Sequence, residues 1–379
     1  MAGFEEVKPS TVEEWNKVLH WVYAQAPPSE PAAPPTRGER RFVVREAGRV
    51  VTACRVRDYT VARGPVQVRC GGVAAVATLI EDRRSSHGAD LMAGLLGAMR
   101  ENDQPISALY AFKNSYYSKF GYGLSGYQWQ IKSPAHRLPR RASALEVTRL
   151  DPKDWKKLQE CYAQFAAVRS GNLVRRPEEW AVRLAPDNGA IYAMGDPVRS
   201  FAVVKFDGFW GTAEVREAVY ADAEGHDALI YLFHSLVSNQ EAVKWCEPPD
   251  SRFLAHFLEQ GMEARRHGTT MFRIVDVSAA LGLLQPAGKG SFTIQVDDPH
   301  ANWNAGPWKV AWEGGNVEVT AAKESGLSLS IGALSQAYMG SPSFAQLLWD
   351  GFVLVKDRAQ AESAARFFGS LPVSMIDTF

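Results

Sequence analysis

Residues 76–89 read VATLIEDRRSSHGA. An apolar strand ends within this stretch, Arg83 and Arg84 follow in a turn, and small residues lead into a helix. The unpaired N–H groups and the positive dipole end of a helix start attract anions. Ser86 and Gly88 let the backbone approach a pyrophosphate closely, and the two arginines add charge-assisted hydrogen bonds. The same residues are also compatible with a solvated helix start that is capped by serine.

The residues on either side predict an α/β domain over residues 1–140. The expected elements are a helix at 11–24, a hairpin at 41–60, a strand region at 65–80, a helix at 88–101, a strand at 106–112, a short helix at 115–120 and a strand at 122–131. Gly71 and Gly72 predict a bulge or kink within the third of these elements.

The pattern begins again after a loop-rich linker. Residues 141–270 predict a helix at 152–167, strands at 190–194, 201–206 and 213–220, and a helix at 227–237. Residues 213–236 (AEVREAVYADAEGHDALIYLFHSL) can be laid beside residues 73–96, which indicates an internal repeat. The second copy has acidic residues where the first has arginines, and an acidic loop would repel a pyrophosphate.

A third part, residues 271–379, has a different pattern. It predicts strands at 291–296, 308–312, 317–320 and 327–330, and helices at 333–338, 343–348 and 359–368. The whole chain is therefore expected to be α/β (α+β), with two related domains followed by a small α+β module.

The composition excludes several classes of protein. The 379 residues include 42 Lys and Arg and 42 Asp and Glu, with a pI near 7.1, which argues against a nucleic-acid or anionic-membrane partner. No apolar run is long enough to span a bilayer, and the N-terminus has no signal-peptide pattern. The four cysteines are far apart, and no H-E-x-x-H occurs, so we expect a cytoplasmic protein without a metal site.

A second informative stretch, residues 110–123, reads YAFKNSYYSKFGYG. Together with residues 76–89 it resembles the GNAT acyltransferases, and more narrowly the Eis (enhanced intracellular survival) family. The resemblance implies that acetyl-CoA is the acyl donor and that the backbone of Val76 and Thr78 meets its pantetheine like an added strand. The residues implied to cradle the pyrophosphate are Arg83, Arg84, Ser86, Gly88 and Ala89.

The resemblance also implies catalytic residues. Tyr117 matches the tyrosine that protonates the leaving thiolate in many GNAT enzymes, and Tyr122 is a secondary candidate nearby. Tyr117 is equally compatible with simple packing. The terminal carboxylate of Phe379 would reach the catalytic cleft and help to deprotonate the substrate amine; the alternative for this residue is an ordinary frayed tail.

The rest of the chain fits the same resemblance. In the Eis family a second, degenerate GNAT domain follows the first, and a sterol-carrier-protein-like module closes the chain; residues 271–281 (MFRIVDVSAAL) and 337–351 (AYMGSPSFAQLLWDG) are similar to that module. The implied acceptor is a primary amine of an aminoglycoside-, lysine- or polyamine-like molecule that attacks the thioester directly. Relatives form homo-oligomers, including hexamers.

One position departs from the family pattern R-x-x-G-x-G/A, because Ser86 replaces its first glycine. If that site requires a left-handed backbone, serine costs about 1 kcal/mol or more. Weak cofactor binding therefore stays open. The alternative function is a catalytically weak GNAT-derived protein that binds a ligand or a lipid.

Overall fold

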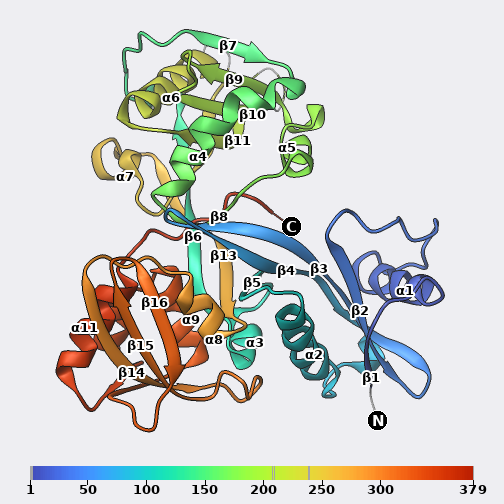
Figure 1. Ribbon diagram of the computed structural model, residues 1–379. Helices are drawn as coiled ribbons and strands as arrows, with labels where there is room; N and C mark the ends of the chain where they lie inside the picture. Colours follow the sequence, from blue (N-terminus) through green and yellow to red (C-terminus); the bar gives the residue numbers. More distant parts are fainter. Residues whose placement is uncertain (1–2, 207, 209, 238–239, 379) are drawn as a thin grey trace.

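Two sheets organise the molecule (Figure 1). The computed structural model describes residues 3–206, 208, 210–237 and 240–378, except the side chain of Thr269. The larger sheet has 13 strands in the order β1-β2-β3-β4-β5-β13-β6-β12-β11-β10-β9-β7, with β8 paired to β3. The smaller sheet has the order β16-β15-β14-β17-β18.

The N-terminal part has a helix on each face of its sheet. Its elements are β1 (Gly3–Glu6), α1 (Val12–Tyr23), β2 (Glu39–Glu46), β3 (Arg49–Arg63), β4 (Val66–Thr78), η1 (Ile80–Asp82), α2 (His87–Glu101), β5 (Ile106–Tyr110), α3 (Asn114–Tyr117), η2 (Ser118–Phe120) and β6 (Gly123–Pro134). Successive side chains of β2 point to opposite faces of the sheet, and this alternation explains why one helix packs on each face. Phe42 belongs to the core that contains Leu95 of α2, whereas Val43 packs in the core that contains Trp15 of α1.

The second part repeats the strand order of the first. Its elements are η3 (Ala135–Arg137), β7 (Val147–Leu150), η4 (Pro152–Leu158), α4 (Gln159–Ala167), β8 (Ser170–Leu173), α5 (Pro177–Arg183), η5 (Pro186–Asn188), β9 (Ala190–Met194), β10 (Ser200–Phe206), β11 (Thr212–Tyr220), α6 (Ala223–Leu236), β12 (Ala242–Glu247) and α7 (Arg252–His256). An antiparallel run ends in β11, and α6 leads to the parallel strand β12, just as α2 leads from β4 to β5. The predicted internal repeat is therefore present in the topology.

The third part forms the smaller sheet with its helices. Its elements are α8 (Val277–Gly282), β14 (Lys289–Asp297), β15 (Gly306–Glu313), β16 (Asn316–Ala321), β17 (Leu327–Ser330), α9 (Ile331–Met339), α10 (Phe344–Trp349), β18 (Leu354–Val355) and α11 (Arg358–Phe368). Aromatic side chains fill its core, where Phe292 packs on Phe367 with ring centroids 5.4 Å apart. The mixed α/β fold with an α+β module is therefore confirmed.

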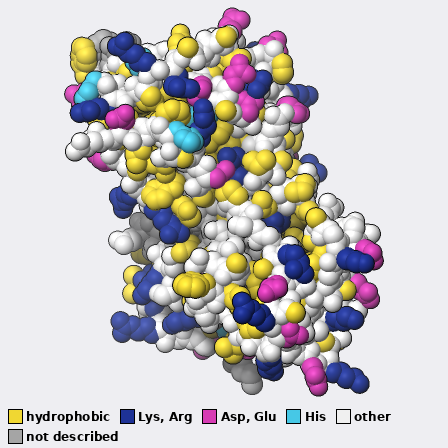
Figure 2. All heavy atoms as spheres, turned by 90° about the vertical axis from the view of Figure 1, so that its left-hand side faces the viewer, with side chains coloured by type: hydrophobic (Ala, Val, Ile, Leu, Met, Phe, Trp, Pro, Cys, Tyr) yellow, Lys and Arg dark blue, Asp and Glu magenta, His cyan; other side chains and the backbone are white. Residues whose placement is uncertain are grey.

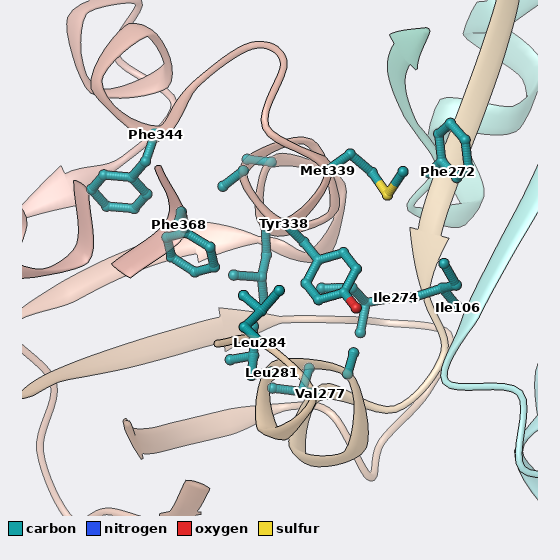
Figure 3. Close-up of a cluster of buried hydrophobic side chains, with 14 of the residues drawn as sticks. Ile106, Phe272, Ile274, Val277, Leu281, Leu284, Tyr338, Met339, Phe344 and Phe368 are labelled. Carbon is teal, nitrogen blue, oxygen red and sulfur yellow. The ribbon is translucent and has the colours of Figure 1, made fainter. Parts of the chain in front are cut away.

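Strand β13 (Glu263–Ile274) joins these parts, because it lies between β5 and β6 of the N-terminal part. Phe272 and Ile274 of this strand share one apolar core with Tyr338 and Met339 of α9 (Figure 3). Residue 271, where the third domain was expected to begin, lies inside β13. The division into 1–140, 141–270 and 271–379 stays a prediction.

The irregularity in β4 lies elsewhere than predicted. The register between β3 and β4 shifts between Ala53 and Arg55, and Ala75 opposite them has a left-handed φ of 54°. Gly71 has a different role, because a Cβ on it would lie 2.3 Å from the sulfur of Met99 in α2. The glycine is thus explained by close packing of helix on strand rather than by a bulge.

The surface and the helices of the described residues have three further features. No helix in the described part of the chain is long and apolar enough to cross a bilayer. Charged side chains of both signs are interspersed over the face seen in Figure 2. Within the described residues, no group of three or more His, Cys, Asp or Glu side chains could hold a metal ion.

Candidate active site

The parallel strands β4 and β5 separate along their length. They pair from Cys70 and Ile106 to Gly72 and Ala108, but β4 continues to Thr78 with β3 as its partner. Beyond Gly72, the edge of β4 on the side of β5 therefore pairs with no described strand. An extended ligand can form backbone hydrogen bonds with this edge. A cavity of about 990 Å³ lies along this edge.

Six of the seven residues predicted to bind the acyl donor line this cavity, and Ser86 does not. The six are Val76, Thr78, Arg83, Arg84, Gly88 and Ala89. The separation of the strands explains why residues of β4 and of the α2 start face one space.

The start of α2 has backbone N–H groups and positive charge that are available to an anion. Ser86 is its N-cap residue, but the Ser86 hydroxyl donates to Asp90 (3.0 Å) and leaves the first turn without a side-chain cap. Arg49 pairs with Asp82 (2.7 Å), whereas no ion pair of Arg83 or Arg84 is found among the described residues. The positive charge of these two side chains is therefore available to a ligand in the cavity.

The backbone at Ser86 does not have the left-handed conformation that would disfavour serine. Its φ of −74° is ordinary for a helix, so serine is not strained there. The left-handed residue is instead Arg84, with φ 68°. An arginine in that conformation costs about 1 kcal/mol, and such strain is typical of ligand-binding loops.

Several cavity residues were not predicted as ligands. Tyr116 and Lys119 belong to the stretch that carried the resemblance, and Tyr116 explains Gly88, because a Cβ there would lie 2.3 Å from the Tyr116 hydroxyl. His300 comes from the third part, where its Nε2 lies 2.8 Å from the carbonyl oxygen of Lys119. Nothing in the local sequence around His300 indicated this position.

Tyr117 lies beside the cavity rather than in its wall. It is 3% exposed, and its ring makes edge contacts with Tyr116 and Tyr122, with centroids 5.0 and 6.2 Å away. Burial raises the pKa of Tyr117 well above its ordinary value, and nearby Tyr116 and Tyr122 add to this. The phenol therefore stays protonated at neutral pH and can act only as a proton donor.

Tyr122 lies deeper, at the point where β4 and β5 still pair. Its hydroxyl is 2.8 Å from that of Ser107, which itself donates to the carbonyl oxygen of Gly71. Because a serine hydroxyl has a single hydrogen, Tyr122 must donate to Ser107. The Tyr122 hydroxyl proton is thus already used in the hydrogen bond to Ser107.

Phe379 lies outside the described residues, whereas the segment before it makes several backbone contacts. Residues 372–377 run between the N-terminal and second parts (Figure 1). Ser374 donates to the backbone of Ser170 (2.9 Å), and Val373 accepts from the backbone of Tyr127 (3.3 Å). The Tyr110 hydroxyl donates to the carbonyl oxygen of Asp377.

A buried charge network holds this segment. The Asp377 carboxylate accepts from Arg175 Nε (2.8 Å) and from the Tyr162 hydroxyl (3.0 Å). Arg175 also pairs with Glu217 (2.7 Å), which pairs with Arg183 (2.8 Å). Burial alone would raise the pKa of Glu217, but the two arginines outweigh burial and hold that pKa below its usual value.

The matching place in the second part is arranged differently. The Asp222 side chain caps α6 by accepting from the backbone N–H of Gly225 (2.9 Å). Arg199 pairs with both Asp222 and Glu224. A carboxylate therefore already occupies the helix start where an anionic ligand would bind.

Comparison with known proteins agrees with these features. Residues 4–125 match the acetyltransferase (GNAT) domain, and residues 277–375 match the sterol carrier protein domain. An uncharacterized N-acetyltransferase of Streptomyces coelicolor is 26% identical over 332 residues, covering 80% of this chain and 79% of that protein.

Solved structures share the whole fold. A GCN5-related N-acetyltransferase from Anabaena variabilis has a TM-score of 0.87 at 20% identity, with all of both chains covered. Eis1 from Mycobacterium abscessus has a TM-score of 0.80 at 18% identity, again over all of both chains. Taken with the separated strands and the repeated topology, these matches show that the chain contains an acetyltransferase (GNAT) domain over residues 4–125 and a sterol carrier protein domain over residues 277–375, within a fold that it shares with solved N-acetyltransferase structures.

Proposed function

We propose that the protein transfers the acetyl group of acetyl-CoA to a primary amine. The cavity along the edge of β4 beyond Gly72 carries the proposal, since it combines an edge that no described strand covers, two arginines without a carboxylate partner and a helix start without a side-chain cap. The carbonyl oxygens of Val76 and Thr78 accept from the Tyr23 hydroxyl (3.0 Å) and from Arg83 Nε (3.2 Å), and the amides of pantetheine would take the place of these donors. Arg83, Arg84 and the backbone from Ser86 to Ala89 suit a pyrophosphate.

The reaction is a direct displacement. The amine nitrogen attacks the thioester carbonyl, a C–N bond forms, and the C–S bond then breaks to release a thiolate. Tyr117, whose phenol is protonated at neutral pH, donates a proton to that thiolate and regains one from the attacking nitrogen, which carries a surplus proton after the C–N bond has formed. Holding both substrates in one cleft supplies much of the rate.

The amine must lose a proton, because an amine with a pKa near 10 is mostly charged at pH 7. We propose that the terminal carboxylate of Phe379 accepts it, directly or through water. The support is the segment before it, because the Arg175 and Tyr162 contacts of Asp377 hold the chain between the two parts. Tyr122 is the less suitable acid, since its hydroxyl already donates to Ser107.

From the resemblance to Eis proteins we also propose that the protein is a cytoplasmic homo-oligomer, with a hexamer as the candidate assembly. Light scattering measures the number of subunits. The match of residues 277–375 to the sterol carrier protein domain keeps the lipid-binding alternative, although Phe292, Trp312 and Phe367 pack together in the core of that part.

Calorimetric titration with acetyl-CoA tests the proposal, together with an assay of CoA release over a panel of amines. Arg83→Glu should weaken acetyl-CoA binding at least about tenfold, since it places a negative charge beside the pyrophosphate. Glu224→Lys, at the matching helix start of the second part, should leave binding unchanged. Equal effects of the two substitutions would refute the assigned site.

A further inference from the structure

The sheet face under α1 carries more positive than negative charge. Arg41 of β2 and Arg55 and Arg57 of β3 surround the single carboxylate of Glu39, and we call these three arginines the arginine cluster. Arg41 Nε lies 2.9 Å from a Glu39 oxygen, and Arg57 and Arg55 approach the other oxygen at 3.7 and 3.9 Å. Glu39 is 2% exposed, so it balances only one of three buried or half-buried guanidinium groups.

Each member of the arginine cluster has one buried nitrogen without a hydrogen-bond partner among the described residues: Arg41 Nη1, Arg55 Nε and Arg57 Nε. Arg57 does donate from Nη1 to the Tyr59 hydroxyl (3.4 Å). Burial lowers the pKa of Arg55, and the neighbouring positive charge of Arg57 lowers it further. Withdrawing a guanidinium from water without a full counter-charge is costly, and such groups are concentrated at functional sites.

The arginine cluster lies next to the place where acyl transfer is proposed. Arg57 is paired opposite Gly72, the last residue of β4 that pairs with β5, and Arg55 is opposite Ala74. Neighbouring strands are about 4.8 Å apart. Arg55 also lies close enough to act on Tyr23, whose hydroxyl donates to the Val76 carbonyl oxygen (3.0 Å) at the cavity.

We propose that the acceptor amine carries an anionic group, a carboxylate or a phosphate, that Arg55 and Arg57 bind. This inference rests on the proposed acetyltransferase function. The two side chains are two residues apart on one strand face, about 7 Å along the strand, so both guanidinium groups can converge on one anion. A polycationic acceptor would meet excess positive charge there.

The carboxylates nearby do not change this balance. Glu14 pairs with Arg45, Glu179 with Arg176, and Asp377 with Arg175, so each of these acids already has a partner. If the carboxylate of Phe379 also reached the arginine cluster, three positive charges would still face two negative ones. Amino-acid-like acceptors therefore match the charge of the arginine cluster better than aminoglycosides or polyamines do.

Matched pairs of amines test the inference through CoA release. The pairs are β-alanine with propylamine, and phosphoethanolamine with ethanolamine. The wild type should prefer the anionic member by about tenfold or more in kcat/KM. The double variant Arg55→Gln, Arg57→Gln should remove this preference while acetyl-CoA affinity is unchanged, and Arg55→Lys, Arg57→Lys should retain part of it.

Arg69→Gln is the control, since Arg69 is an exposed arginine of β4 that pairs with Asp58. A wild type that prefers the neutral amines overturns the inference and leaves the proposed function intact. The inference also fails if the double glutamine variant slows both members of a pair equally, which is the result expected for deletion of Phe379. In that case the bound anion is the chain's own carboxylate.

A binding measurement keeps the test independent of turnover. Inorganic phosphate is titrated calorimetrically into the CoA-saturated wild type and into the double glutamine variant. Binding to the wild type that the variant loses supports the anion site, whereas no binding or equal binding overturns it. Failure of acetyl-CoA itself to bind would instead contradict the proposed function.

Discussion

Asp377→Asn would remove one charge from a buried network that is neutral in the wild type. Arg175 and Arg183 carry two positive charges, and Glu217 and Asp377 carry two negative ones. The Arg175 side chain is 0% exposed, so the substitution leaves a buried network in which Arg175 and Arg183 share the single carboxylate of Glu217. Breaking a buried pair in this way costs about 3–5 kcal/mol. Residues 372–378 are bound between the two parts in the wild type and would be detached from them in an alternative state. The equilibrium constant between the bound and detached states should therefore shift toward the detached state by a factor of about 10² to 10³·⁵.

Hydrogen exchange followed by mass spectrometry measures this directly. Peptides that contain residues 372–378 should lose protection, and kcat/KM for the amine should fall about a hundredfold, as expected when a general base is displaced. Acetyl-CoA affinity should not change, because the cavity lies on other elements. Tyr162→Phe removes the hydroxyl that lies 3.0 Å from the Asp377 carboxylate and 2.8 Å from the Leu173 carbonyl oxygen, and it should give a smaller change of the same kind because the Arg175 ion pair remains.

Glu214→Gln is the matched control. Glu214 lies on β11 like Glu217, but its ion pair with Arg216 is exposed, and such pairs contribute about 0–1 kcal/mol. The reasoning is refuted if Asp377→Asn leaves both the protection of the terminal segment and the turnover at wild-type values.

The remaining predictions concern single groups in and near the cavity. Tyr117→Phe should lower kcat at nearly constant acetyl-CoA affinity; because burial raises its pKa, the wild-type kcat/KM should rise with pH as the amine deprotonates and show no falling limb below about pH 10. A Tyr117-dependent falling limb at lower pH would contradict this role. Gly88→Ala should weaken acetyl-CoA binding in calorimetry, because its Cβ would lie 2.3 Å from the Tyr116 hydroxyl; Tyr116→Phe in the same protein should restore part of the affinity. His300→Ala should weaken acetyl-CoA binding about threefold to tenfold through loss of its contact with Lys119, and equal affinity would exclude a role of the third part. Deleting Phe379 moves the terminal carboxylate by about 3.5 Å and should reduce kcat/KM for the amine about a hundredfold, whereas an N-terminal tag should have no effect.

Local patterns were the most informative part of the sequence. The passage from strand to helix at residues 76–89 forms as predicted, because periodicity, turn residues and small residues all act over a few positions. Six predicted ligand residues share one cavity for the same reason, since all lie on β4, on the α2 start or between them. Their part in binding, like those of Tyr117 and Phe379, stays a prediction.

Long-range features could not be predicted in this way. Asp377, Arg175 and Glu217 are far apart in the chain, and nothing in any one of their local patterns shows that they meet. The bulge was expected at glycines but lies at Ala75, because pairing with β3 sets the register and local residue preference does not. The arginine cluster was likewise invisible, since alternating charges on a strand do not show which face they share with the active site.

Strand β13 has a consequence for the order in which the protein can be made. Synthesis proceeds from the N-terminus, and domains usually fold as they leave the ribosome. Here β5 and β6 receive their common partner only from residues 263–274, after the entire second part has been translated. Until β13 is inserted, β5 and β6 each have an unpaired edge where β13 later lies, and unpaired edges favour association with other chains. The catalytic sheet is therefore completed late, and a ribosome that stalls within the second part releases an incomplete sheet rather than a small working enzyme.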